Sequence, residues 1–317
     1  MQLFTPVALP PAPFRLTPVS RVLTLGSCFA QHIGQHIAAA LPNGHALVNP
    51  FGPLYAPQVI AHHLRLLLDT APLPDATYFE GVEGMWHNRW FSTHVSSAEF
   101  ATCRRLTTDA LSAARDLLRC ADVLVLTLGT DRCYRSPDGL LVANCHKQPA
   151  ATFTEHAADV ETLTSDLRCA LDSLRALRPE LQVVWTVSPY RYAKYGLHAS
   201  QLAKARLLLA VDALCATDER SVYFPAYELL LDELRDYRYY ARDLLHPSDT
   251  AVELIGERFA DWCFAPALHT FARERARLLR AHQHRPLHPE SDAHRAFRAK
   301  LRHEAELFKA KWGFSPF

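Results

Sequence analysis

The sequence has no strong excess of charge and no long apolar run. Its 317 residues include 34 Lys and Arg and 33 Asp and Glu, which gives a formal net charge of +1. This balance favours neither nucleic acid nor an anionic membrane as a partner. No apolar run reaches the roughly 20 residues that a membrane-spanning helix needs. Residues 1–6 lack a basic start followed by an apolar stretch. We therefore expect no signal peptide and a soluble, cytoplasmic protein.

Patterns typical of metal sites and disulfide frameworks are also missing. The eight cysteines are spread along the chain without a CxxC pair, which favours reduced thiols. The 17 histidines include no HExxH sequence. His32 and His36 are four residues apart, but one face of a helix explains that spacing equally well. We expect no metal and no cofactor.

The residues that are present predict an α/β protein. Apolar runs rich in Val and Leu alternate with helical spacing, an order that favours right-handed βαβ units and a parallel sheet covered on both faces. The expected strands cover residues 22–26, 45–48, 121–130, 182–189 and 222–225. The expected helices cover 29–37, 59–68, 104–119, 155–177, 199–216, 227–240, 249–264, 267–283 and 291–311. A small hairpin is expected at 134–142, and the irregular segment 70–100 suggests a lid or a binding loop.

A small nucleophilic side chain stands where the first strand turns into a helix. Ser27 follows Gly26 at this point, and the first N–H groups of a helix have no internal partners. A hydroxyl there can attack a carbonyl while nearby N–H groups stabilise the oxyanion. A serine at this position also serves as a helix N-cap. Cys28 is an alternative nucleophile, although we expect it to point away from the site and pack with its helix.

An acid and a base candidate lie late in the chain, three residues apart. Asp243 and His246 flank two leucines, which we expect to anchor the turn in the core. A carboxylate bonded to one imidazole nitrogen leaves the other nitrogen free to take a proton from a serine. The alternative is a capped helix start with a surface histidine.

Several motifs, in order along residues 22 to about 264, together resemble the GSCFA family. The family takes its name from a sequence found here at residues 26–30. The other matching segments are 49–52, 126–130, 142–147, 186–189, 223–228, 232–238, and Asp243 with 246–248.

The GSCFA family is similar to the SGNH/GDSL esterases and lipases. That resemblance implies a three-layer α/β/α fold with a flavodoxin-like strand order. It also implies that Ser27 is the nucleophile, with Asp243 and His246 as acid and base, and that the N–H groups of Ser27 and Gly52 form the oxyanion hole. The chain departs from the SGNH pattern at 129–131, where Gly-Thr-Asp replaces GxND. Thr130 or Asn144 is then the candidate for the third oxyanion donor.

These inferences predict a serine esterase that acts on an acylated carbohydrate or another small ester. The alternative is a non-catalytic protein of the same fold that binds a carbohydrate or another ligand. The candidate substrate contacts lie on loops after strand-like segments, and each of their charges also suits a salt bridge or a solvated position; they are Asn49, His146, Lys147 and Arg191. The expected organisation is a proline-rich arm at 1–20, the GSCFA domain at 21–265, and a helical hairpin at 266–317.

Overall fold

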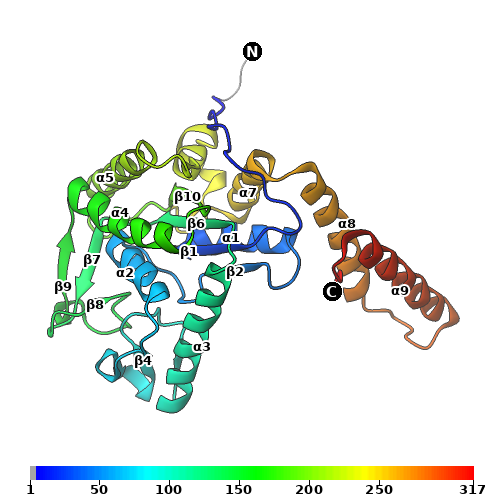
Figure 1. The fold of residues 1–317 in the computed structure, drawn as a ribbon, viewed down its shortest axis with the longest axis horizontal. Helices are drawn as coiled ribbons and strands as arrows, with labels where there is room; N and C mark the ends of the chain where they lie inside the picture. Colours follow the sequence, from blue (N-terminus) through cyan, green and yellow to red (C-terminus); the bar gives the residue numbers. More distant parts are fainter. Residues whose placement is uncertain (1–4) are drawn as a thin grey trace.

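A five-stranded parallel sheet forms the centre of the protein, whose computed structural model describes residues 5–317 (Figure 1). The strands lie in the spatial order β11-β10-β6-β1-β2, which is the predicted flavodoxin-like order 2-1-3-4-5 read from the opposite edge. Their bounds are β1 Val22–Gly26, β2 Ala46–Val48, β6 Val123–Leu128, β10 Gln182–Val187 and β11 Ser221–Tyr223.

Helices cover both faces of this sheet, so the predicted three-layer α/β/α fold is confirmed. Alternate residues of one strand point to opposite faces. In β6, Leu124 and Leu126 belong to one buried cluster, and Val123 and Val125 belong to the other. The first cluster includes residues of α2 Pro57–Leu68, α3 Phe100–Leu118, α4 Val160–Leu177 and α5 Leu197–Cys215. The second includes residues of α1 Cys28–Ala40 and α7 Asp249–Cys263.

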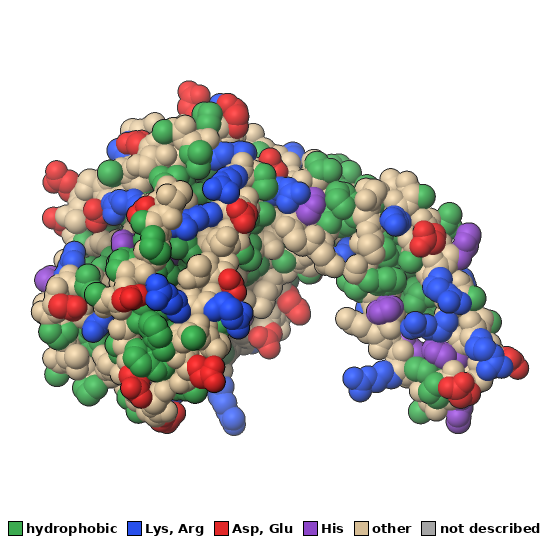
Figure 2. Space-filling model, turned by 60° about the horizontal axis from the view of Figure 1, so that its bottom comes forward, with side chains coloured by type: hydrophobic (Ala, Val, Ile, Leu, Met, Phe, Trp, Pro, Cys, Tyr) green, Lys and Arg blue, Asp and Glu red, His purple; other side chains and the backbone are tan. Residues whose placement is uncertain are grey.

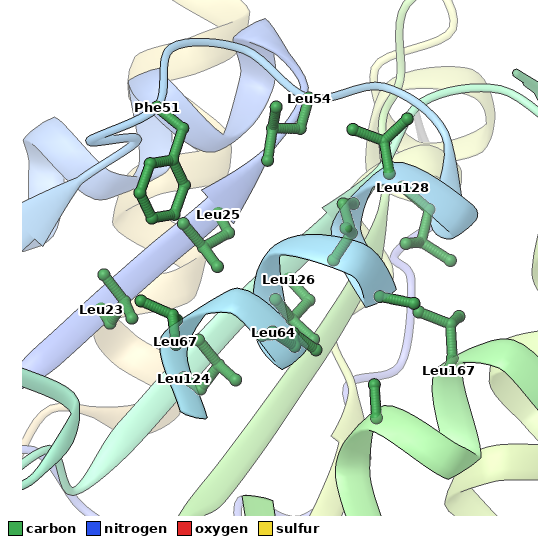
Figure 3. Close-up of a cluster of buried hydrophobic side chains, with 14 of the residues drawn as sticks. Leu23, Leu25, Phe51, Leu54, Leu64, Leu67, Leu124, Leu126, Leu128 and Leu167 are labelled. Carbon is green, nitrogen blue, oxygen red and sulfur yellow. The ribbon is translucent and has the colours of Figure 1, made fainter. Parts of the chain in front are cut away.

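Leucines dominate the first cluster (Figure 3). Leu25 of β1 and Leu126 of β6 lie beneath Leu64 and Leu67 of α2, and Leu167 of α4 closes the cluster from the side. Burying each such side chain contributes roughly 1.5–3 kcal/mol, so these contacts hold the strand ends at fixed positions.

Two segments contain strands that the sequence did not reveal. The segment expected to be irregular, 70–100, contains a small antiparallel sheet of β3 Tyr78–Glu80, β4 Trp86–Asn88 and β5 Ser96–Ser97. A second sheet joins the expected hairpin strands, β7 Arg132–Arg135 and β8 Leu141–Val142, to β9 Thr154–Ala157. The helix expected from residue 155 therefore begins later, at Val160, where the Asp159 side chain accepts the Thr162 N–H at 2.8 Å.

The helix expected at 227–240 is wrong as a continuous element. The chain forms a short α6 Ala226–Glu228, a π-helical turn at Leu229–Glu233 and a 3-10 turn at Tyr237–Tyr239. Asp236 is extended, with φ −144° and ψ 143°, and its carboxylate accepts the Arg238 N–H. This local bond competes with helix formation and starts the new turn.

The last two helices form the expected C-terminal hairpin, α8 Pro266–Gln283 and α9 Asp292–Trp312, which projects from the body of the protein (Figure 1). It is attached where α8 packs on α1, and the buried Arg275 donates to the carbonyls of Ala39 and Leu41 at 3.0 Å. Figure 2 shows Lys, Arg and His side chains spread over the hairpin.

The N-terminal segment runs beside α7 and the start of α8. The Leu16 N–H donates to the Cys263 carbonyl at 2.7 Å, and the Ala265 N–H donates back to the Leu16 carbonyl at 2.8 Å. Residues 1–4 of the expected arm lie outside the described residues. The domain limits at 20 and 265 remain predictions. Within residues 5–317, no helix is both long and apolar enough to cross a membrane.

Candidate active site

The turn from β1 into α1 is fixed by a glycine at the carboxyl end of the strand. Gly26 has a φ of +140°, and a Cβ at this position would lie 2.2 Å from the Thr127 carbonyl oxygen of β6. Only glycine fits so close to a neighbouring strand. The chain therefore leaves the sheet abruptly, and α1 begins two residues later, at Cys28.

Ser27 is buried in this turn, with its polar groups already bonded. Its side chain is the N-cap of α1 and accepts the Phe29 N–H at 3.3 Å, and the residue is 1% exposed. The Ser27 N–H donates to the Thr127 carbonyl at 3.0 Å. The sheet thus uses this donor in the structure, and the contribution of the Ser27 N–H to an oxyanion hole stays a prediction.

The N–H of Gly52, the other predicted oxyanion donor, is also bonded within the backbone. This N–H donates to the Asn49 carbonyl at 2.8 Å and closes a tight turn, in which Gly52 has a φ of +74°. The Gly52 N–H, which was expected to face the oxyanion, is therefore bonded to a backbone carbonyl.

A cavity of about 390 Å³ opens beyond the carboxyl ends of β6 and β10. This is the edge of an open α/β sheet at which ligands bind. Its lining includes Cys28, Tyr55, Asn144, Tyr190 and His246. Within the described part of the chain, Ser27 does not belong to the lining, although it directly precedes Cys28.

Asp243 and His246 come together at the mouth of this cavity, as the sequence predicts. His246 Nδ1 lies 2.5 Å from Asp243 Oδ2, and Asp243 Oδ1 accepts the N–H groups of Leu245 and His246 at 3.0 Å each. The backbone N–H of His246, its imidazole and the Leu245 N–H hold the pKa of Asp243 well below its ordinary value. The pair is nearly half exposed, with side-chain exposures of 46% for His246 and 45% for Asp243.

The expected anchoring of this turn by its leucines is wrong for Leu244. That residue is 55% exposed and has a φ of +59°. Contacts to the loop after β10 hold the turn instead. The Arg191 N–H donates to the Leu245 carbonyl at 2.9 Å, and the Tyr190 ring stacks on the His246 imidazole at 4.2 Å.

Two polar side chains of the lining suit the predicted third oxyanion donor. Asn144 Oδ1 accepts from Thr93 Oγ1 at 3.1 Å and from the His146 N–H at 2.8 Å, which fixes the orientation of its side-chain amide. The Asn144 amide nitrogen has no hydrogen-bond partner among residues 5–317. The Thr130 hydroxyl accepts the Arg132 N–H at 3.3 Å and retains its own proton to donate.

Asp131, which the sequence sets against the asparagine of the SGNH pattern, lies outside the cavity lining within residues 5–317. It is 1% exposed, and its carboxylate pairs with the Arg206 guanidinium at 2.7 Å.

The predicted substrate contacts stay outside the lining as far as residues 5–317 show. Asn49 Nδ2 donates to the Gly26 and Ser27 carbonyls at 3.2 Å each, so it braces the turn before α1. His146 is buried against the rings of Phe79 and His87, and burial lowers its pKa to about 4.

The two remaining predicted contacts are cationic. Lys147 is exposed, with a φ of +59°. The Arg191 guanidinium donates to the Tyr227 hydroxyl at 3.4 Å. Within residues 5–317, neither residue belongs to the cavity lining.

A buried lysine beneath the strand ends escaped sequence analysis. Lys204 is 1% exposed, and its Nζ donates to the carbonyls of Gly129 and Ser188 at 2.7 and 2.8 Å. Gly129 and Ser188 both line the cavity. Burial lowers the pKa of Lys204 to about 7. The sequence spacing does indicate the burial of Lys204, because this residue shares the buried face of α5 with Leu207 and Val211.

Cationic and aromatic side chains form the wall far from α1. Arg132, Tyr134 and Lys194 line it, and Lys194 Nζ lies 2.7 Å from the Tyr134 hydroxyl. Glu155 behind them accepts from Arg132 at 2.6 Å and from the Tyr195 hydroxyl. Burial acts to raise the pKa of Glu155, but these hydrogen bonds lower it to about 2. The Glu155 carboxylate therefore holds Arg132 and Tyr195 in place. With Arg132 and Lys194 against one carboxylate, this wall has a net positive charge.

Comparisons with known proteins agree with the motifs of this chain. The GSCFA family matches residues 21–259. A search of curated proteins found no match.

Two similar solved structures are both described as esterases. One is a carbohydrate esterase family 3 protein from Talaromyces cellulolyticus, with 11% identity and a TM-score of 0.35. The other is an acetyl esterase mutant with an acetate ion, with 11% identity and a TM-score of 0.36. Each match covers 80% of this chain and 99% of the other. Likenesses this weak indicate nothing about the substrate of this chain.

Proposed function

This chain belongs to the GSCFA family, and we propose that it is an ester hydrolase that works through an acyl-enzyme. The observation that carries the proposal is the bonded pair of Asp243 and His246 at the mouth of a cavity beyond the strand ends. The nucleophile comes from the turn between β1 and α1, where the sequence predicts Ser27 in a triad with the pair.

The pair supplies the proton transfers. Asp243 accepts from Nδ1 of His246, so Nε2 is the nitrogen that can take a proton. His246 then acts as general base during attack and as general acid toward the leaving alcohol. Asp243 also stabilises the imidazolium that forms between these steps.

The developing oxyanion needs donors other than the bonded N–H groups of Ser27 and Gly52. The Asn144 amide and the Thr130 hydroxyl both line the cavity, and the Lys204 ammonium lies directly behind its floor. One well-placed donor of this kind contributes about 3–4 kcal/mol to transition-state stabilisation.

The cavity suits a small ester whose alcohol is polar. Its volume is at the lower end of the roughly 300–1,000 Å³ typical of small-molecule sites. Tyr55, Tyr190 and Tyr192 offer flat rings with hydroxyl groups, and Arg132 and Lys194 offer donors on the far wall. An acylated carbohydrate would use both features, so we propose acetylated sugars as the first substrates to test.

A ligand-binding protein without hydrolysis is the second candidate. Two observations favour it: the N–H groups of Ser27 and Gly52 are bonded to backbone carbonyls, and Asp131 is ion-paired. A crevice of this kind can hold a sugar without stabilising an oxyanion.

The test compares wild type with His246→Ala on p-nitrophenyl acetate and on an acetylated xylo-oligosaccharide. Removing the general base lowers kcat/KM by about 100- to 10,000-fold. The matched control is His288→Ala, which removes an exposed histidine between α8 and α9 and leaves the rate unchanged. Turnover by His246→Ala at the wild-type rate contradicts the proposed roles. A folded wild type without turnover on either ester favours the binding protein.

A further inference from the structure

We infer that Cys28, rather than Ser27, is the nucleophile, and that the acyl-enzyme is a thioester. The inference rests on the proposed function, because it assigns the attacking atom of the same site. The sequence instead favoured Ser27 as the nucleophile and Cys28 as the alternative.

The two neighbours differ in what they face. Ser27 is 1% exposed, and its hydroxyl already accepts a hydrogen bond from the helix it caps. Cys28 is half-buried and lines the cavity. A substrate in the cavity would have to reach Ser27 behind the lining, whereas Cys28 already belongs to the lining.

The base lies on the same cavity as the thiol. His246 and Cys28 both line it, and Tyr190 lies near both of them. The Tyr190 ring stacks on His246 at 4.2 Å. Burial, followed by the charges of Asp243 and Cys28, raises the pKa of the Tyr190 hydroxyl. Tyr190 therefore shares the cavity with the thiol and contacts the imidazole of the Asp243–His246 pair.

The surroundings of Cys28 also explain why this thiol needs a base. Burial raises the pKa of the Cys28 thiol, although the Phe29 N–H and the Lys204 charge act in the opposite direction. The thiol is therefore protonated near neutral pH. The first residue of α1 also places Sγ where the helix dipole stabilises a developing thiolate.

The reaction balances with water as the second substrate. The Cys28 S–H proton moves to His246 Nε2 while Sγ bonds to the ester carbonyl carbon. The ester C–O bond breaks, and the leaving alkoxide takes the proton from His246. Water then attacks the thioester and gives a proton to His246. The S–C bond breaks, the thiolate recovers that proton, and a carboxylic acid leaves.

The experiment measures kcat/KM on p-nitrophenyl acetate for Cys28→Ala, Cys28→Ser and Ser27→Ala. Thermal melting shows which variants are folded. We expect Cys28→Ala to lose about 1,000-fold or more, as the loss of a catalytic nucleophile does in serine proteases. Cys28→Ser keeps the shape of the side chain and serves as the second variant if Cys28→Ala does not fold. We expect its kcat/KM to fall by about 100-fold. Ser27→Ala removes a helix cap and should stay within about threefold of wild type.

Alkylation supplies an independent readout. Cys120 and Cys169 are exposed and Cys145 lines the same cavity, so all three are first replaced by Ser to remove competing labelling. In that protein, iodoacetamide should modify Cys28 and abolish turnover at the same rate. Added substrate should slow both the modification and the loss of turnover. Full turnover by Cys28→Ala, or by the alkylated protein, overturns the inference and leaves the ester hydrolase intact. Absence of turnover in wild type overturns both proposals.

Discussion

The two sides of the cavity are built in different ways. On one side, the turn from β1 into α1 lies within the sheet, with Ser27 bonded to β6 and braced by Asn49. On the other side, Asp243 and His246 occupy an exposed loop that is held by its own hydrogen bonds and by the ring of Tyr190.

The two sides therefore control different properties of the protein. The nucleophile turn is positioned by the core, so a change that alters its backbone geometry disturbs folding as well as chemistry. The loop of Asp243 and His246 contributes little buried surface, so a change there should alter the rate and leave the fold intact.

The largest expected effect is on the buried side, at Gly26. Gly26→Ala places a Cβ 2.2 Å from the Thr127 carbonyl oxygen, at a φ that also strains any other residue. We expect a loss of more than about 4 kcal/mol in the free energy of unfolding, measured by urea denaturation. Gly44→Ala is the matched control, since it has a φ of +78° and open space around it. It should cost only about 1–2 kcal/mol. Equal losses for the two variants would contradict the close packing of β1 and β6.

The next effect belongs to the exposed side. Asp243→Asn removes the carboxylate that orients and stabilises the His246 imidazolium. We expect kcat/KM to fall by about 100- to 10,000-fold, with a melting temperature close to that of wild type. Asp109→Asn, on the exposed face of α3, is the control for losing one surface carboxylate. A large drop in the melting temperature of Asp243→Asn would remove the contrast between the two sides.

The smallest effect concerns Lys204, on the buried side. Its pKa is about 7 in the folded protein and near 10.5 when it is unfolded. Between these values the unfolded chain binds more protons, so the cost of burying the charge is full below pH 7 and is relieved as pH rises. Relative to Lys204→Met, wild type should gain roughly 1 kcal/mol of unfolding free energy per pH unit above pH 7. The exposed Lys309→Met should show no such trend. A parallel pH dependence of wild type and Lys204→Met would show that the buried ammonium keeps an ordinary pKa.

Much of the fold follows from the sequence, because its signals are local and repeated. Runs of Val and Leu identify the five parallel strands, and Gly26 marks where the first one ends. Asp243 and His246 were predictable as a pair because the bond between them spans only three residues.

Other features depend on contacts between distant segments. β9 forms because Thr154–Ala157 pairs with β7, and no local pattern distinguishes it from the start of a helix. The sequence does not show whether the N–H groups of Ser27 and Gly52 have partners, and in the structure both donate to backbone carbonyls. Whether Ser27 or Cys28 faces the cavity depends on the dihedral angles of one turn, which the order of residues does not reveal.

The most direct test of the central claim is to locate the acyl group. Wild type is quenched in acid during turnover of p-nitrophenyl acetate, and its peptides are mapped by mass spectrometry before and after neutral hydroxylamine, which cleaves thioesters. A thioester intermediate leaves one acetyl group on Cys28 that hydroxylamine removes. An acetyl group on Ser27 that resists hydroxylamine, or turnover without any adduct on Cys28, would contradict it.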